Sequence, residues 1–295
     1  MEKPTFNIVD VFAEEKFTGN QLAVFRFVKK LSDGQMQRIA KEMNYSETTF
    51  ILSDEKQDGG YDVRIFTPEI EVPFAGHPTL GTAFVIQHEI IKEPINKIVL
   101  NLKAGKIPVS FSYDGEKSCT LWMKQLPPLF GEKFDAELIS KILSLDICDI
   151  NAVFPIQEVS TGLPAVIVPL KTLDAVKKAR INRDRYFEFI KDIEAKTILI
   201  FCPETYNIAH DLNVRFFADH YGIPEDPATG SANGCLAAYL VKHRYFGTHR
   251  INLQVEQGYE IGRPSLLFLK AEKKKQELAV YVGGKVEMIA KGELV

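Results

Sequence analysis

Cysteine is scarce in this sequence, and its few copies are scattered. The chain has four, Cys119, Cys148, Cys202 and Cys235, and they form no Cys-x-x-Cys pair. This arrangement is typical of reduced thiols in a cytosolic protein, not of a disulfide framework or a zinc ribbon. We therefore expect a cytoplasmic protein with free cysteines.

The sequence also lacks an excess of charge of one sign and any long apolar run. Its formal net charge is −3, which gives no electrostatic reason to bind nucleic acid. We interpret the three lysines at residues 273–275 as a solvated hairpin tip. No segment is long and apolar enough to span a bilayer, and the first residues contain no apolar signal core. We thus expect neither nucleic acid nor membrane as a partner.

Two further classes of motif are missing. No Gly-x-Gly-x-x-Gly follows a strand pattern and no Walker sequence occurs, which argues against a doubly wound nucleotide-binding fold. His77, His88 and Glu89 do not form a His-Glu-x-x-His pattern, and His243 and His249 lack a matching carboxylate. We therefore predict no metal site.

Strand patterns dominate what is present. Residues 6–12 and 21–27 alternate as two strands across the Gly19-Asn20 turn, and short turns of this kind join antiparallel neighbours. Further strands are predicted at residues 48–52, 61–66, 97–102, 107–113, 118–124, 155–160, 165–169, 197–201, 211–217, 251–256, 265–270, 278–282 and 286–291. Ser32 and Gln35 form a capping-box pattern that predicts the start of a helix.

The length of 295 residues is enough for two domains of about 150 residues each. Pro127 and Pro128, followed by Gly131, mark the best candidate linker. We predict an N-terminal lobe of residues 1–126, to which a tail of about residues 285–295 can return, and a C-terminal lobe of residues 127–284.

Two segments about half the chain apart follow the same pattern. One runs over residues 64–84 and the other over residues 215–236. Each passes from an alternating strand, through a turn with glycine and ionisable residues, into a helix of small apolar residues. The repetition indicates a duplicated domain whose copies can face each other across one cleft.

The helices that end these repeats, at about residues 80–86 and 234–241, are apolar around most of their girth. Such a helix is buried on most sides. In a strand-rich domain this predicts a sheet wrapped around a central helix. The expected class is α+β, with two similar lobes, each an antiparallel β-barrel around a central α-helix, and the active site in the cleft between them.

Three turns carry the candidate acid–base groups. Glu47 follows the capped helix, His77 falls at the predicted N-cap of the first central helix, and Asp226 is held extended before the second by Pro227. Structural alternatives exist for each: a solvated turn carboxylate, a histidine that caps its own helix, and a well-capped helix start. Taken together, they are the groups that proton abstraction and return require.

The starts of the two central helices are the candidate substrate-binding positions. Gly76 begins the first with His77, and Gly230 and Ser231 begin the second. A helix N-terminus presents free N–H groups and partial positive charge, so two of them in one cleft would hold a small anion.

These segments, in this order and spacing, resemble the phenazine-biosynthesis PhzF-like isomerases within the diaminopimelate-epimerase fold. The matching segments are Asp10-Val11-Phe12 with Phe17-Thr18-Gly19-Asn20, Ser46-Glu47-Thr48, and residues 64–68, 72–79 and 225–234. The resemblance implies two barrel-like lobes with a central helix each, an active site between them, no cofactor, and a homodimer.

The resemblance also implies roles for single residues. The catalytic glutamate of the family falls on Glu47, and its partners in substrate handling fall on His77 and Asp226. The anion-binding helix starts fall on Gly76 with His77 and on Gly230 with Ser231.

Racemases of this fold use two cysteines, and the matching positions here are Ala75 and Asp226, while Cys235 lies further along its helix. This difference favours carboxylate-based isomerisation. We expect a cofactor-independent isomerase that moves a proton on a small carboxylate-containing molecule. An amino-acid epimerase and a non-catalytic small-metabolite-binding protein are the alternatives.

Overall fold

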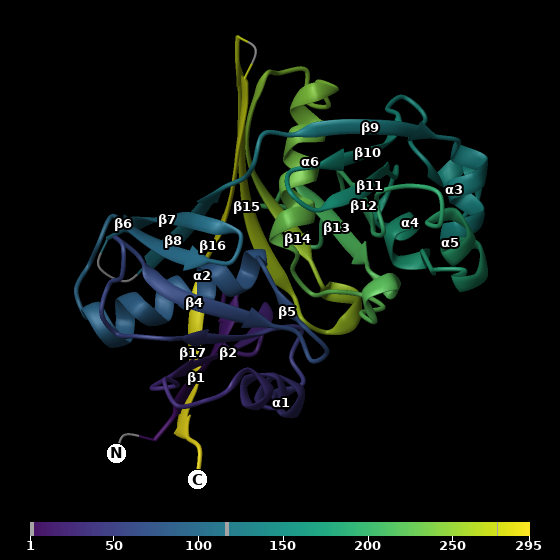
Figure 1. The fold of residues 1–295 in the computed structure, drawn as a ribbon. Helices are drawn as coiled ribbons and strands as arrows, with labels where there is room; N and C mark the ends of the chain where they lie inside the picture. The colour runs from purple at the N-terminus through teal and green to yellow at the C-terminus, as the bar shows by residue number, and fades with distance from the viewer. Residues whose placement is uncertain (1–2, 116–117, 276) are drawn as a thin grey trace. The chain divides into compact units, whose positions relative to one another are not determined.

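The computed structural model describes residues 3–115, 118–275 and 277–295. The chain divides into two compact units: Met1–Met123 with Gly283–Val295, called unit 1, and Lys124–Val282, called unit 2. Figure 1 shows that strands make up much of each unit. No helix among the described residues is long and apolar enough to cross a membrane.

In unit 1 the strand order is β17-β1-β2-β3-β4-β6-β7-β8, with β5 beside the far end of β4. Its strands are β1 (Thr5–Val11), β2 (Asn20–Arg26), β3 (Thr48–Ile51), β4 (Tyr61–Phe66), β5 (Glu71–Val72), β6 (Lys97–Leu102), β7 (Gly105–Asp114), β8 (Ser118–Lys124) and β17 (Val286–Glu293). Its helices are α1 (Asp33–Met43), α2 (Gly76–Val85) and the π-helix η1 (Ile86–Ile91).

In unit 2 the order is β9-β10-β11-β12-β13-β14-β15. The strands are β9 (Leu129–Phe134), β10 (Ile156–Ser160), β11 (Pro164–Pro169), β12 (Ile198–Cys202), β13 (Leu212–Phe217), β14 (Arg250–Gln257), β15 (Ser265–Lys274) and β16 (Glu277–Gly284), which ends in unit 1. The helices are α3 (Ala136–Leu143), α4 (Leu173–Lys178), α5 (Arg183–Phe189) and α6 (Gly230–Lys242), with short 3-10 turns η2 (Ile147–Asp149), η3 (Asp219–Tyr221) and η4 (Tyr259–Ile261). The predicted linker around Gly131 is thus partly strand, because β9 pairs with β10.

The predicted combination of helices and sheet in one fold is confirmed, but the prediction of purely antiparallel sheets is wrong. Each unit contains two parallel pairs: β2 with β3 and β4 with β6 in unit 1, and β11 with β12 and β13 with β14 in unit 2. Parallel neighbours need a long crossover, usually helical. Here α1, α2, the α4–α5 pair and α6 supply those four crossovers. Closure of either unit into a barrel stays a prediction from the sequence.

The helices α2 and α6 are buried, as predicted from their small apolar residues. α2 packs against β1 and β2, and α6 packs against β10, β11 and β15 (Figure 1). At Gly81 in α2, an added Cβ would lie 2.6 Å from Leu22 Cδ2 and 2.8 Å from Val11 Cγ2. The absence of a side chain therefore lets the backbone of α2 approach the sheet closely.

The internal repeat extends to side chains. In unit 1, Arg64 binds Glu71 through Nε and Nη2, both at 2.9 Å, and its guanidinium lies 5.0 Å from the Phe66 ring centroid. In unit 2, Arg215 binds Glu225 at 2.9 and 2.7 Å and lies 4.9 Å from the Phe217 ring. The same ion pair and ring contact therefore occur once in each unit.

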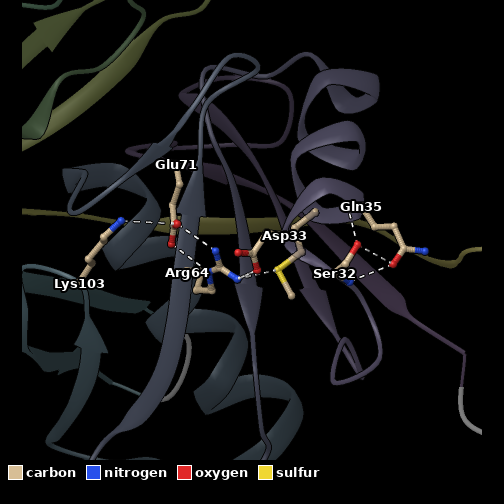
Figure 2. Close-up of polar contacts among 7 residues, drawn as sticks. Ser32, Asp33, Gln35, Arg64, Glu71 and Lys103 are labelled. Carbon is tan, nitrogen blue, oxygen red and sulfur yellow. Dashed lines mark hydrogen bonds and ion pairs between the residues drawn. The ribbon is translucent and has the colours of Figure 1, made fainter.

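The start of α1 agrees with the capping-box prediction. Gln35 N donates to Ser32 Oγ at 3.3 Å, and Ser32 N donates to Gln35 Oε1 at 2.9 Å. Figure 2 shows these two residues near Arg64 and Glu71. Arg64 Nη1 also donates to Asp33, in the first turn of α1, at 2.6 Å. The cap fixes where α1 begins, and α1 in turn leads to Glu47.

Candidate active site

The first group of candidate residues lies at the start of α2. Ala75 is the N-cap, with extended backbone at φ −151° and ψ 147°, so Gly76 and His77 are the first two helical residues. The prediction that His77 is the N-cap is therefore wrong, since the extended conformation that ends the preceding turn falls two residues earlier. The His77 side chain consequently belongs to the first turn of the helix and does not cap it.

The His77 ring is buried between two side chains from other elements. Asn20, the first residue of β2, places Nδ2 at 3.3 Å from His77 Nδ1. On the other side, His77 Nε2 lies 3.5 Å from Glu47 Oε2. Burial lowers the pKa of His77 to about 3, although a hydrogen bond with the Gln21 backbone acts in the opposite direction. The ring is therefore neutral at neutral pH and can donate one proton and accept another.

Glu47 lies between α1 and β3. α1 ends at Met43, and Asn44 follows as its C-cap in the left-handed conformation with φ 52°. β3 then begins at Thr48, and all four of its residues are buried. Glu47 therefore directly precedes a buried strand, and its side chain is 18% exposed. The structure brings Glu47, Gly76 and His77 together within unit 1.

The second group lies at the start of α6 in unit 2. Thr229 is the N-cap, and Gly230 and Ser231 are the first helical residues. The Thr229 hydroxyl donates to the Asp226 carboxylate, which is 7% exposed. This hydrogen bond holds the Asp226 carboxylate at the start of α6. Asp226, Gly230 and Ser231 form this second group.

The two central helices differ from the other α-helices in how they begin. α1, α3, α4 and α5 each have a side-chain cap, from Ser32, Asp135, Thr172 and Asn182. Within the described chain, the N-cap residues of α2 and α6, Ala75 and Thr229, form no side-chain hydrogen bond to the first turn of their helices. Amides at a helix start without such a cap, together with the helix dipole, favour an anion.

The thiol in α6 does not suit a racemase mechanism. Cys235 is fully buried, and its Sγ lies 3.6 Å from Thr161 Oγ1. Burial raises the pKa of Cys235 to about 11, so the thiol is protonated at neutral pH and is a poor base.

As for metals, no three His, Cys, Asp or Glu side chains gather as a ligand set within the described ranges.

A separate cavity in unit 1, of about 400 Å³, does not include Glu47 or His77. Arg64, Glu71 and Lys103 lie along its wall, and Figure 2 shows how these charges compensate one another. Glu71 accepts from Arg64 and lies 3.7 Å from Lys103 Nζ. Because these charged groups already bind each other, we assign this cavity no catalytic role.

Two buried amides that contact the candidate groups were not among the predicted site residues. Asn20 contacts His77, and Gln257 at the end of β14 contacts Asp226 and Thr229. Asn20 lies in a segment quoted for the family resemblance, which was the available signal. Nothing in the local pattern distinguishes Gln257 from an ordinary strand residue. The single cleft shared by both groups stays a prediction from the sequence.

The chain matches the phenazine biosynthesis-like protein family (PhzC-PhzF) over residues 9–292. It is 35% identical over 288 residues to trans-2,3-dihydro-3-hydroxyanthranilate isomerase of Pseudomonas aeruginosa, covering 97% of each chain. A crystal structure of a PhzF family phenazine biosynthesis protein from Bacillus anthracis, 28% identical, superposes with a TM-score of 0.91 over 100% of both chains.

A more distant structure shares the fold alone. It is a probable proline racemase from Agrobacterium radiobacter, 7% identical, with a TM-score of 0.64 over 99% of this chain and 93% of that chain. The match across nearly the whole chain and the 35% identity to a curated isomerase together fix the family. This protein belongs to the phenazine biosynthesis-like family, the PhzF-like isomerases.

Proposed function

We propose that this protein is a cofactor-independent isomerase that moves a proton within a small carboxylate-containing molecule. One observation carries the proposal: Glu47 Oε2 lies 3.5 Å from Nε2 of the buried His77, at the start of a helix without a side-chain cap. A carboxylate, a neutral imidazole and the backbone amides of a helix start are the groups that such a reaction needs.

In the proposed reaction, Glu47 removes a proton from a carbon made acidic by neighbouring unsaturation. The electron pair of the broken C–H bond moves into the conjugated system, and a proton is then added at another carbon. Glu47, His77 or Asp226 returns that proton, so the composition of the molecule does not change. Positioned proton transfer of this kind contributes about 10²–10⁴-fold to the rate.

The helix starts supply the binding. We assign the substrate carboxylate and the charge that develops in the transition state to the amides at Gly76, Gly230 and Ser231. Support comes from the lack of a side-chain cap on α2 and α6 and from the preference of such sites for anions. We further propose that the enzyme acts as a cytoplasmic homodimer, as the family resemblance implies.

The substrate to test first is trans-2,3-dihydro-3-hydroxyanthranilate, the molecule in the name of the Pseudomonas aeruginosa relative. It is a small carboxylate with C–H bonds beside unsaturation, which fits the proposed chemistry. The 35% identity over 97% of both chains supports this choice.

The experiment compares the isomerisation rate of this molecule for wild type, Glu47→Gln and Glu42→Gln. Glu42 is an exposed glutamate in the last turn of α1, so it controls for the same chemical change a few residues away. We expect Glu47→Gln to lose at least about 10²-fold in kcat and Glu42→Gln to match wild type. A folded Glu47→Gln variant with the wild-type rate would remove the role given to Glu47.

A further inference from the structure

Gln257 is fully buried at the end of β14, and its side-chain amide binds the start of α6 through four hydrogen bonds. Gln257 Nε2 donates to the Asp226 carbonyl at 2.8 Å and to Thr229 Oγ1 at 3.2 Å. Gln257 Oε1 accepts from Thr229 N at 3.2 Å and from Asn233 Nδ2 at 2.8 Å. A glutamine amide has two N–H donors and one oxygen with two lone pairs, so every bonding position of Gln257 is used.

Three backbone groups fix the direction of these bonds. The Asp226 carbonyl can only accept, so the end of Gln257 that faces it must be Nε2. The Thr229 N–H can only donate, so the end that faces it must be Oε1. The Thr229 carbonyl can only accept, so Asn233 presents Nδ2 to it at 3.0 Å and therefore also to Gln257. Neither amide can be flipped without losing hydrogen bonds.

The orientation of Gln257 in turn fixes the Thr229 hydroxyl. Gln257 Nε2 donates to Thr229 Oγ1, so the hydroxyl proton is free to be given to the Asp226 carboxylate. A threonine at an N-cap ordinarily accepts from an amide of the first helical turn, but Thr229 makes no such bond. The Thr229 hydroxyl therefore donates to the Asp226 carboxylate and does not cap α6.

We propose that Gln257, acting through the Thr229 hydroxyl, is a positioning residue for Asp226. The amide holds the hydroxyl in the orientation that donates to Asp226 Oδ2, and so sets the direction of the carboxylate at the start of α6. The inference rests on the proposed function, in which Asp226 is an acid–base group.

The test uses Thr229→Val, which removes the hydroxyl at nearly constant shape, and Thr229→Ser, which keeps it. Gln257→Glu removes both Nε2 donors and keeps the acceptor, and Gln254→Glu is the matched control because Gln254 is exposed on the same strand. With the dihydro-hydroxyanthranilate probe, we expect Thr229→Val and Gln257→Glu to lower kcat about 10- to 100-fold with little change in KM. Thr229→Ser and Gln254→Glu should stay near wild type.

Equal kcat values for Thr229→Val and Thr229→Ser would overturn the positioning role. Crystal structures of wild type and both Thr229 variants give a readout that does not depend on turnover. We expect the Asp226 carboxylate to change its direction in Thr229→Val and to keep it in Thr229→Ser; an unchanged carboxylate in both would also overturn the inference. Failure of the proposed function is distinguishable, because wild type would then not isomerise the probe while these structures still decide the positioning of Asp226.

Discussion

Replacing Gly81 with alanine tests the close packing of α2 against β1 and β2. The added Cβ would meet Leu22 Cδ2 at 2.6 Å and Val11 Cγ2 at 2.8 Å, both closer than real Cβ contacts allow. Gly34 in α1 is the matched control, because an added Cβ there has nothing within 4 Å. The two substitutions are chemically identical and lie in helices of the same unit.

The expected magnitudes follow from two opposing effects. Alanine is favoured over glycine within a helix by roughly 0.5–1 kcal/mol. Overpacking a well-packed core costs about 1–3 kcal/mol. Gly81→Ala should therefore lower the free energy of unfolding by up to about 2.5 kcal/mol, whereas Gly34→Ala should raise it by up to about 1 kcal/mol.

Urea unfolding monitored by tryptophan fluorescence measures the change in the free energy of unfolding of unit 1 for both variants. The chain has one tryptophan, Trp122, which lies in β8 within unit 1. A shift of the midpoint at constant slope reports a change in stability. If Gly81→Ala stabilised unit 1 as Gly34→Ala is expected to do, the close approach of α2 to the sheet would be wrong.

Two further predictions concern charged groups. Glu225→Gln should lower the free energy of unfolding by about 3–5 kcal/mol, because Arg215 is only 5% exposed and loses its buried partner. Glu71→Gln should lower the free energy of unfolding by only about 1 kcal/mol, because Arg64 is 23% exposed and keeps its ion pair with Asp33. Urea unfolding followed by circular dichroism would contradict this if the two losses were equal. The pKa of His77 is about 3 in the folded state and 6.5 for the free side chain. Between these two pH values the unfolded state therefore binds more protons than the folded state. The free energy of unfolding consequently falls as the pH falls through this window, by at most about 1.4 kcal/mol per pH unit. His77→Gln should make the pH dependence of the urea midpoint between pH 7 and 5 shallower, and an unchanged slope would count against a buried neutral His77.

The repeated pattern was readable from the sequence because the duplicated segments keep the same chemistry. Arg64 and Arg215 each begin one of these segments, and each binds a glutamate and contacts a phenylalanine ring. The burial of α2 and α6 was predictable as well, since helices without a polar face cannot lie on a surface.

Other features depend on tertiary pairing, which the local pattern does not contain. The parallel pairs, such as β2 with β3, arise because a helix crosses between the two strands. The exact start of α2 could not be read either, because Pro78 is compatible with several positions in a first helical turn and the extended Ala75 decides among them. Gln257 acquires its contacts only when β13 and β14 pair, so no local signal marked it.

The most direct measurement for the role of Glu47 is solvent exchange in deuterated water. Wild type and Glu47→Gln are incubated with the dihydro-hydroxyanthranilate probe, and deuterium bound to carbon is counted by mass spectrometry. We predict that wild type introduces deuterium and that Glu47→Gln, with unchanged circular dichroism, does so at least about 100-fold more slowly. Deuterium incorporation by Glu47→Gln at the wild-type rate would contradict proton transfer by this carboxylate.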